Sequence, residues 1–195
     1  MTSINNRPTS MNLPTDDTSF CLNLFNTIKE TINADQPIII LCIGTDRSTG
    51  DSLGPFIGHY LSLKPLSKLH VYGTIDQPVH AKNLHETIKS IYQTHSNPYV
   101  IAIDAALSSM SKVKSVDVVY GPLLPGAALQ KELPAVGDIS IKGYVNVSGF
   151  MEFSILQNTR LSVVIKMAKQ IAQGLYYTDV YLKHQSSIFK LKGAQ

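Results

Sequence analysis

Two apolar runs, each followed by an aspartate, constrain the fold of this chain more than any other feature. The first run covers residues 38–43 and leads into a loop that reaches Asp51, and the second covers residues 99–103 and is followed at once by Asp104. Runs of this length, rich in isoleucine and valine and bounded by turn residues, are typical of buried parallel strands. Ligands of open α/β sheets bind outside the carboxyl ends of such strands. If the two strands are neighbours, both carboxyl groups therefore face one crevice.

Two carboxyl groups in one crevice favour particular kinds of chemistry. Because close carboxylates do not both ionise readily, such a pair holds a proton, a metal ion or a polarised water. A structural role is the alternative for each residue. Asp51 could cap the helix that follows it, and Asp104 could be a buried acid bonded to backbone amides. The sequence leaves these alternatives open.

The remaining periodicity predicts strands that alternate with helices. We expect helices over residues 16–33, 52–63, 81–94 and 149–174, and strands over residues 37–43, 69–75, 99–103, 115–120 and 139–147. Residues 127–133 have the pattern of one or two helical turns, and the segment after residue 176 is ambiguous. This order predicts an α/β fold, a three-layer α/β/α sandwich with a mainly parallel sheet. We expect residues 1–15 to be a flexible leader and residues 16–195 to form a single domain.

Composition narrows the class of protein. The chain has 195 residues, of which 44% are hydrophobic and 16% charged, as is usual for a globular domain. A net charge of +3 without a basic cluster argues against nucleic acid as a partner. The start of the chain lacks the pattern of a signal peptide, and no apolar run is long enough to span a membrane. Two cysteines without metal-type spacing indicate free thiols. We therefore expect an intracellular protein with no nucleic acid or membrane partner.

Common nucleotide-binding motifs are missing from the loop before Asp51. Five residues separate Gly44 from Gly50, where a phosphate-binding loop has four, and Asp51 stands where that motif has lysine. The chain also lacks the GxGxxG pattern of dinucleotide-binding folds. The loop is therefore better explained by acid chemistry than by phosphate binding.

His80 is the histidine with the most informative position. It follows the predicted strand over residues 69–75 and precedes a predicted helix, which places it on the same rim as the aspartates. Two carboxylates and an imidazole suit a divalent transition metal, so Asp51, Asp104 and His80 define a metal-dependent alternative. The ordinary explanation is an exposed or capping histidine at a helix start. Asp46, in the loop before Asp51, could bind a ligand or form loop hydrogen bonds.

Five segments of the chain resemble a known family. They read GTDRSTGDSLGP at residues 44–55, GTIDQPVHA at 73–81, AIDA at 102–105, PGA at 125–127 and NVSGFME at 146–152. These segments resemble the YyaC family of sporulation proteins, and the resemblance covers about residues 36–175. That family is similar to the germination protease of spore-formers and, more distantly, to the hydrogenase maturation endopeptidases. The resemblance implies a phosphorylase/hydrolase-like α/β/α fold.

The same resemblance implies roles for individual residues. Asp51 and Asp104 match the two catalytic acids of the germination protease. In the hydrogenase endopeptidases, similar acids and a later histidine hold nickel, but this chain has no histidine at that later position, and His80 comes from a different loop. Pro125 and Gly126 match a Pro-Gly stretch of the germination protease, which implies a place in a substrate groove.

Together, residues and resemblance predict a spore-associated, peptidase-like protein in the cytoplasm of the forespore or the spore interior. We expect Asp51 and Asp104 to be catalytic, and Asp46, His80, Pro125 and Gly126 to bind a protein or peptide substrate. We expect neither a metal nor another cofactor. The alternatives are the metal-dependent hydrolase described above and a non-catalytic spore protein that keeps the fold and binds a peptide.

Overall fold

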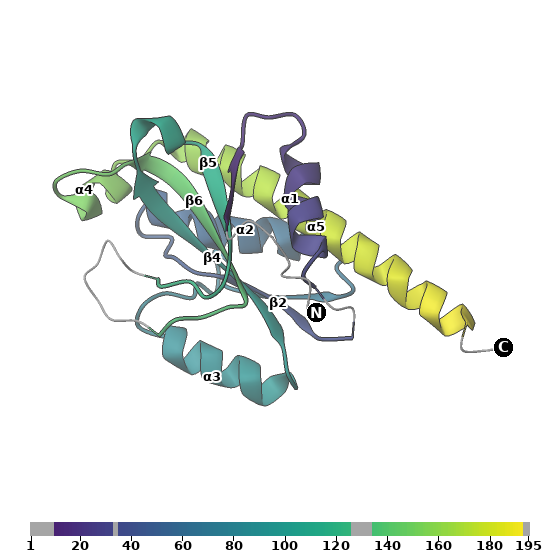
Figure 1. The fold of residues 1–195 in the computed structure, drawn as a ribbon. Helices are drawn as coiled ribbons and strands as arrows, with labels where there is room; N and C mark the ends of the chain where they lie inside the picture. Colours follow the sequence, from purple (N-terminus) through teal and green to yellow (C-terminus); the bar gives the residue numbers. More distant parts are fainter. Residues whose placement is uncertain (1–9, 33–34, 126–133, 193–195) are drawn as a thin grey trace, which may run out of the picture.

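The computed structural model describes residues 10–32, 35–125 and 134–192, with side chains described as far as residue 186. One six-stranded sheet organises this part of the chain (Figure 1). Its strands are β1 (Ser10–Pro14), β2 (Ile38–Cys42), β3 (Leu69–Tyr72), β4 (Tyr99–Ser108), β5 (Ser115–Tyr120) and β6 (Ile139–Val147). The α-helices are α1 (Phe20–Lys29), α2 (Leu53–Ser62), α3 (Leu84–Thr94), α4 (Glu152–Gln157) and α5 (Leu161–Lys192). Two 3₁₀ turns, η1 (Gly50–Ser52) and η2 (Met110–Lys112), complete the set.

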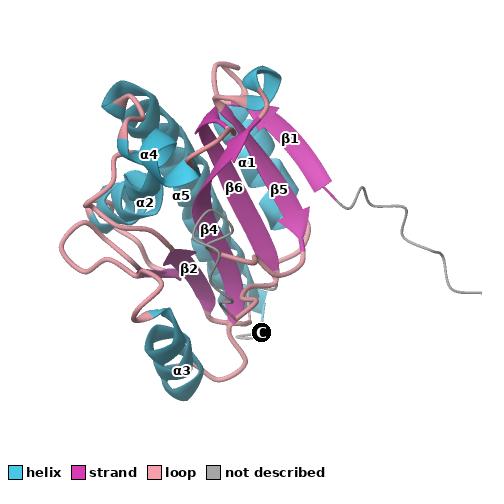
Figure 2. Cartoon of the chain, turned by 90° about the vertical axis from the view of Figure 1, so that its left-hand side faces the viewer, coloured by secondary structure: helices cyan, strands magenta, loops and turns pink. Residues whose placement is uncertain are grey.

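The sheet is mainly parallel, as the sequence predicts. Its strand order is β1-β5-β6-β4-β2-β3, and the strands from β6 to β3 pair in parallel. Strands β5 and β1 add an antiparallel edge beside β6, and Figure 2 shows β1, β5, β6 and β4 side by side. The α/β class is therefore confirmed.

Alternate residues of the central strands define the two helical layers. On one face, Ile38, Ile40, Ile101 and Ile103 belong to a buried cluster that also contains the apolar residues of α1, α2 and α5. On the other face, alternate residues of β2 and β4 pack with Leu84 and Ile91 of α3. Because both faces of β2 and β4 are buried, their sequences are continuously apolar rather than alternating.

The layer that contains α3 is incomplete over β5 and β6. On that face, paired residues of neighbouring strands form a polar row: Asn12 of β1, Asp117 of β5, Lys142 of β6 and Asp104 of β4. Asp117 accepts a 2.7 Å hydrogen bond from Tyr144 and a 3.1 Å one from Lys112. This polar half of the sheet leaves room for a site beside the carboxyl end of β2.

Two predictions from the sequence are wrong, one for residues 10–14 and one for the end of β4. Residues 10–14 do not belong to a flexible leader, because they form β1 and pair with β5, with Leu13 buried. Residues 1–9 of that predicted leader lie outside the described residues. Strand β4 does not end before Asp104 but continues to Ser108, with a register shift after Ala106. The small and polar residues there resemble a strand end, but pairing with β6 keeps them extended.

The predicted helix over residues 149–174 is two helices in the structure. Helix α4 ends at Gln157 and α5 begins at Leu161. In the break, the Thr159 hydroxyl donates to the Ile155 carbonyl at 2.9 Å and accepts from the Asn146 amide at 3.2 Å. These bonds to β6 fix the end of α4.

Helix α5 runs on to Lys192, which settles the ambiguous C-terminal segment, whereas the turns predicted for residues 127–133 lie outside the described residues. Among the described helices, none combines the length and apolar character needed to cross a membrane.

Candidate functional site

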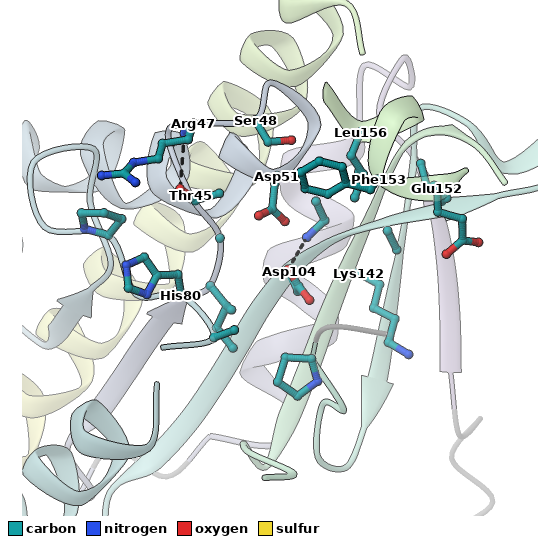
Figure 3. Close-up of a pocket in the computed structure, with 18 of the residues that line it drawn as sticks. Thr45, Arg47, Ser48, Asp51, His80, Asp104, Lys142, Glu152, Phe153 and Leu156 are labelled. Carbon is teal, nitrogen blue, oxygen red and sulfur yellow. Dashed lines mark hydrogen bonds between the residues drawn. The ribbon is translucent and has the colours of Figure 1, made fainter. Parts of the chain in front are cut away.

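A pocket of about 720 Å³ lies at the carboxyl ends of the parallel strands (Figure 3). Its walls come from the loop between β2 and α2, the loop before α3, the second half of β4, strand β6 and helix α4. The residues predicted from sequence that line it are Asp46, Asp51, His80, Asp104 and Pro125. Gly126 lies outside the described residues. The fold thus brings five of the six predicted site residues to one cavity of the size that small ligands and peptide segments occupy.

Asp51 lies in the 3₁₀ turn η1, directly before α2. Neither η1 nor α2 has a side-chain hydrogen bond at its N-cap, so the structure does not support the alternative that Asp51 caps a helix. Burial raises the pKa of the Asp51 carboxyl above its usual value, and the charge of His80 opposes this by lowering it. A carboxyl group of this kind keeps its proton to a higher pH than a solvated one.

Close backbone packing holds the Asp51 loop in place. Gly44 has a φ of +145°, and its Thr45 neighbour donates a backbone hydrogen bond to the Asp51 carbonyl at 3.1 Å. In α2, a Cβ built on Gly54 would lie 2.1 Å from the carbonyl oxygen of Ile43. Helix α2 therefore approaches the end of β2 more closely than any side chain would permit, and this contact sets the height of Asp51 above the sheet.

Replacing Gly54 by alanine is expected to lower the free energy of unfolding by about 1–3 kcal/mol, because the new methyl group overlaps rigid backbone. Denaturant unfolding followed by circular dichroism measures this change. Gly149 is a matched control, since its φ is not positive and the nearest atom to its Cβ position, Ile155 Cδ1, lies at 3.5 Å, an ordinary van der Waals distance. A Gly54→Ala protein as stable as wild type would contradict the close approach.

Asp104 lies within β4, one residue past the level at which the neighbouring strand β2 ends. This follows from the register, in which Cys42, the last residue of β2, pairs with Ile103. Its Oδ1 accepts a 2.9 Å hydrogen bond from the Ala105 backbone N–H. Figure 3 shows the side chains of Asp51 and Asp104 directed into the same pocket. The crevice inferred from sequence therefore exists, although Asp104 reaches it from inside a strand.

His80 is held by the turn before α3. Its backbone N–H donates to the Asn83 side chain at 2.8 Å, and Asn83 in turn donates to the Pro78 carbonyl at 3.0 Å. Asn83, not His80, is the N-cap residue of α3, so His80 does not cap that helix. Its Nδ1 is buried and has no hydrogen-bond partner, as is also true of Ser48 Oγ on the opposite side of Asp51. Both residues line the pocket.

Sequence reasoning missed several residues of the pocket wall: Arg47, Lys142, Tyr144, Glu152 and Phe153. One of them, Lys142, pairs with Asp104 across the β4–β6 register. The alternation of Ser140, Lys142 and Tyr144 in β6 is the signal that predicts a polar face there. The short helix α4 gave no such signal, and Phe153, which is 55% exposed, enters the pocket only because the helix breaks after Gln157.

The metal-dependent alternative finds little support in this geometry. Within residues 10–32, 35–125 and 134–192, no three histidine, cysteine, aspartate or glutamate side chains are grouped closely enough to hold a metal ion. Asp51, Asp104 and His80 are all described, so this statement covers the trio considered above. The three residues share a pocket without forming a coordination site.

Comparison with known proteins places the chain in a family. The profile of a family described as "Protein of unknown function (DUF1256)" matches residues 12–174, and the chain belongs to this family. The chain is 55% identical, over 146 residues, to the "Uncharacterized protein YyaC" of Bacillus subtilis (strain 168). That match covers 75% of this chain and 71% of the relative. The resemblance to YyaC inferred from the five segments is therefore confirmed.

A solved structure gives a weaker similarity. It is the [NiFe] hydrogenase maturation protease HycI from Thermococcus kodakarensis KOD1, with a TM-score of 0.49 and 13% sequence identity. The match covers 77% of this chain and 99% of the protease. A similarity of this size does not by itself establish a shared activity.

Proposed function

We propose that the protein is a peptidase that hydrolyses a peptide bond with Asp51 and Asp104, and that it acts in the spore interior or forespore. The observation that carries the proposal is the convergence of two carboxyl groups in one pocket, Asp51 from the turn η1 and Asp104 from strand β4, the first with a raised pKa. Pairs of acids whose surroundings favour different protonation states are typical of acid–base catalysis.

The two acids then have different roles. Asp51, whose pKa is raised by burial, donates its proton to the leaving amine. Asp104, which pairs in register with Lys142, takes a proton from water as that water attacks the scissile carbonyl carbon. Asp46, His80 and Pro125 on the pocket wall, and Gly126 beyond the described residues, bind the peptide on either side of the scissile bond.

Incubation with a spore protein extract tests this proposal. We expect new peptide termini, identified by mass spectrometry, with the wild type and not with the Asp51→Asn or Asp104→Asn proteins. Asp76→Asn is a matched control, because this acid lies in the loop before His80 but does not line the pocket. Binding of a peptide without cleavage by the wild type would contradict catalysis and favour the non-catalytic alternative.

A specific surface feature favours that second candidate. Phe150, Met151 and Phe153 are 95%, 66% and 55% exposed, and Phe153 lines the pocket. Exposed apolar residues that adjoin a pocket mark sites of protein or peptide binding. Binding through these residues needs no catalysis, so the cleavage experiment decides between the two functions.

A further inference from the structure

The loops that carry Asp51 and His80 are joined to each other. Val79, the residue before His80, forms a parallel bridge with Ile43 at the end of β2. Its carbonyl accepts a 2.8 Å hydrogen bond from the Gly44 N–H, and the next residue, Thr45, is bonded to the Asp51 carbonyl. A continuous set of backbone hydrogen bonds therefore fixes the position of the imidazole relative to the carboxyl group.

The two side chains interact within this frame. Both line the same pocket, and the charge of His80 favours the ionised form of Asp51. His80 Nδ1 is buried without a partner, although a neutral imidazole has one nitrogen that donates and one that accepts. The ring thus has unused hydrogen-bonding capacity beside a group whose proton the proposed reaction consumes.

Asp51 needs such a neighbour. It is half-buried, and a substrate that fills the pocket would separate it further from bulk water. After Asp51 has given its proton to the leaving amine, it must be protonated again before the next turnover. An imidazole held in the same pocket, which can take up and release a proton, supplies that route.

We propose that His80 returns a proton to Asp51 after each turnover, a role that rests on the proposed peptidase function and goes beyond substrate binding. In the step, an N–H bond of the imidazolium breaks as its proton passes to an intervening water, and that water gives one of its protons to the Asp51 carboxylate, where an O–H bond forms. The neutral imidazole then takes a proton from water at the pocket mouth, to which the proton held by Asp104 is released. The protons balance over one hydrolysis, and no group is oxidised or reduced.

Other charged groups of the pocket act on the same pair. They come from every element around it: Asp46 and Arg47 from the loop before Asp51, Lys82 from the loop of His80, Asp104 from β4, Lys142 from β6 and Glu152 from α4. This set contains three acids and three bases. The effect of His80 on Asp51 is therefore measured by removing one partner at a time.

Titration without substrate tests the coupling. We expect the midpoint of the Asp51 carboxyl, followed by carbon-13 NMR, to rise in His80→Gln, because the imidazolium charge is lost. By linkage, Asp51→Asn should lower the midpoint of His80 by the same amount. His85→Gln is the control, since His85 is exposed on α3 and does not line the pocket. An Asp51 midpoint unchanged in His80→Gln would overturn the proposal even if the protein is a peptidase.

Kinetics with a peptide that the wild type cleaves tests the proton return itself. His80→Gln should lower the steady-state rate at least about tenfold more than it lowers the rate of the first turnover, as expected for removal of a proton-transfer group. Added imidazole should restore the steady-state rate. Equal slowing of the first turnover and the steady state would show that His80 only binds substrate. If the wild type cleaves no peptide although the titrations of Asp51 and His80 are coupled, the peptidase proposal fails, whereas the coupling between the two groups stands.

Discussion

Replacing Asp179 by alanine is expected to lower the free energy of unfolding by about 3 kcal/mol, although this residue lies far from the pocket. Asp179 is in α5, is 1% exposed, and its carboxylate accepts hydrogen bonds from the backbone N–H groups of Ser67, Lys68 and Leu69 at 2.7–3.1 Å. The Ser67 hydroxyl adds a further bond at 3.2 Å. These bonds attach α5 to the turn that begins β3, so their loss leaves a buried N–H group of Leu69 without a partner.

Chemical denaturation of wild type, Asp179→Ala and Asp179→Asn checks this expectation. Asparagine keeps one oxygen acceptor and should cost less than alanine. Lys166→Ala, at an exposed position of the same helix, should change stability by no more than about 0.5 kcal/mol. If Asp179→Ala and Lys166→Ala were equally stable, the carboxylate would have no part in holding the turn.

The sequence predicted the elements whose patterns are local. Strands β2, β5 and β6 fall within one residue of their expected bounds, because continuous or alternating apolar residues between turn signals define them. Strand β1 has a single buried apolar residue, Leu13, and owes its structure to pairing with β5, about a hundred residues away in the chain. The same reason explains why Asp179 was not recognised: an acid within a helix usually faces solvent, and its partners are 110 to 112 residues distant.

The site was predictable in part for a similar reason. Asp51 and His80 follow strands, so the rule for parallel sheets assigns them to one rim. Asp104 was placed on the same rim by the correct rule but at the wrong position in its strand. Lys142 and Phe153 reach the pocket only through the β4–β6 register and the break between α4 and α5, neither of which has a local signal. Asp51 and Asp104 were thus found from sequence, whereas the cations, Glu152 and Phe153 of the pocket wall were not.

Activity of the proposed peptidase should fall by about 10²–10⁴-fold in both Asp51→Asn and Asp104→Asn, the usual contribution of one acid–base group. In the wild type, activity should also fall as pH rises through the pKa of Asp51, because the reaction needs its protonated form and burial raises that pKa. The measurement is kcat/KM against pH with a cleaved peptide. A rate that rises monotonically from pH 4 to pH 9 would contradict the assignment of Asp51 as the acid.

The Asp51→Asn substitution should lower activity without lowering stability at pH 7, which separates a catalytic acid from a structural one. The folded state holds the Asp51 proton more tightly than the unfolded chain does, so this group stabilises the fold at low pH. That contribution is lost as pH rises from the ordinary aspartate value through the raised pKa. Asparagine carries no charge to bury, and Asp51→Asn should therefore be at least as stable as wild type at pH 7 while it loses activity. Unfolding free energies of both proteins at pH 4 and pH 7 check the sign. An Asp51→Asn protein that is less stable than wild type at pH 7 would mean that the carboxylate holds the loop together. A structural role of Asp51, rather than a chemical one, would then explain the loss of rate.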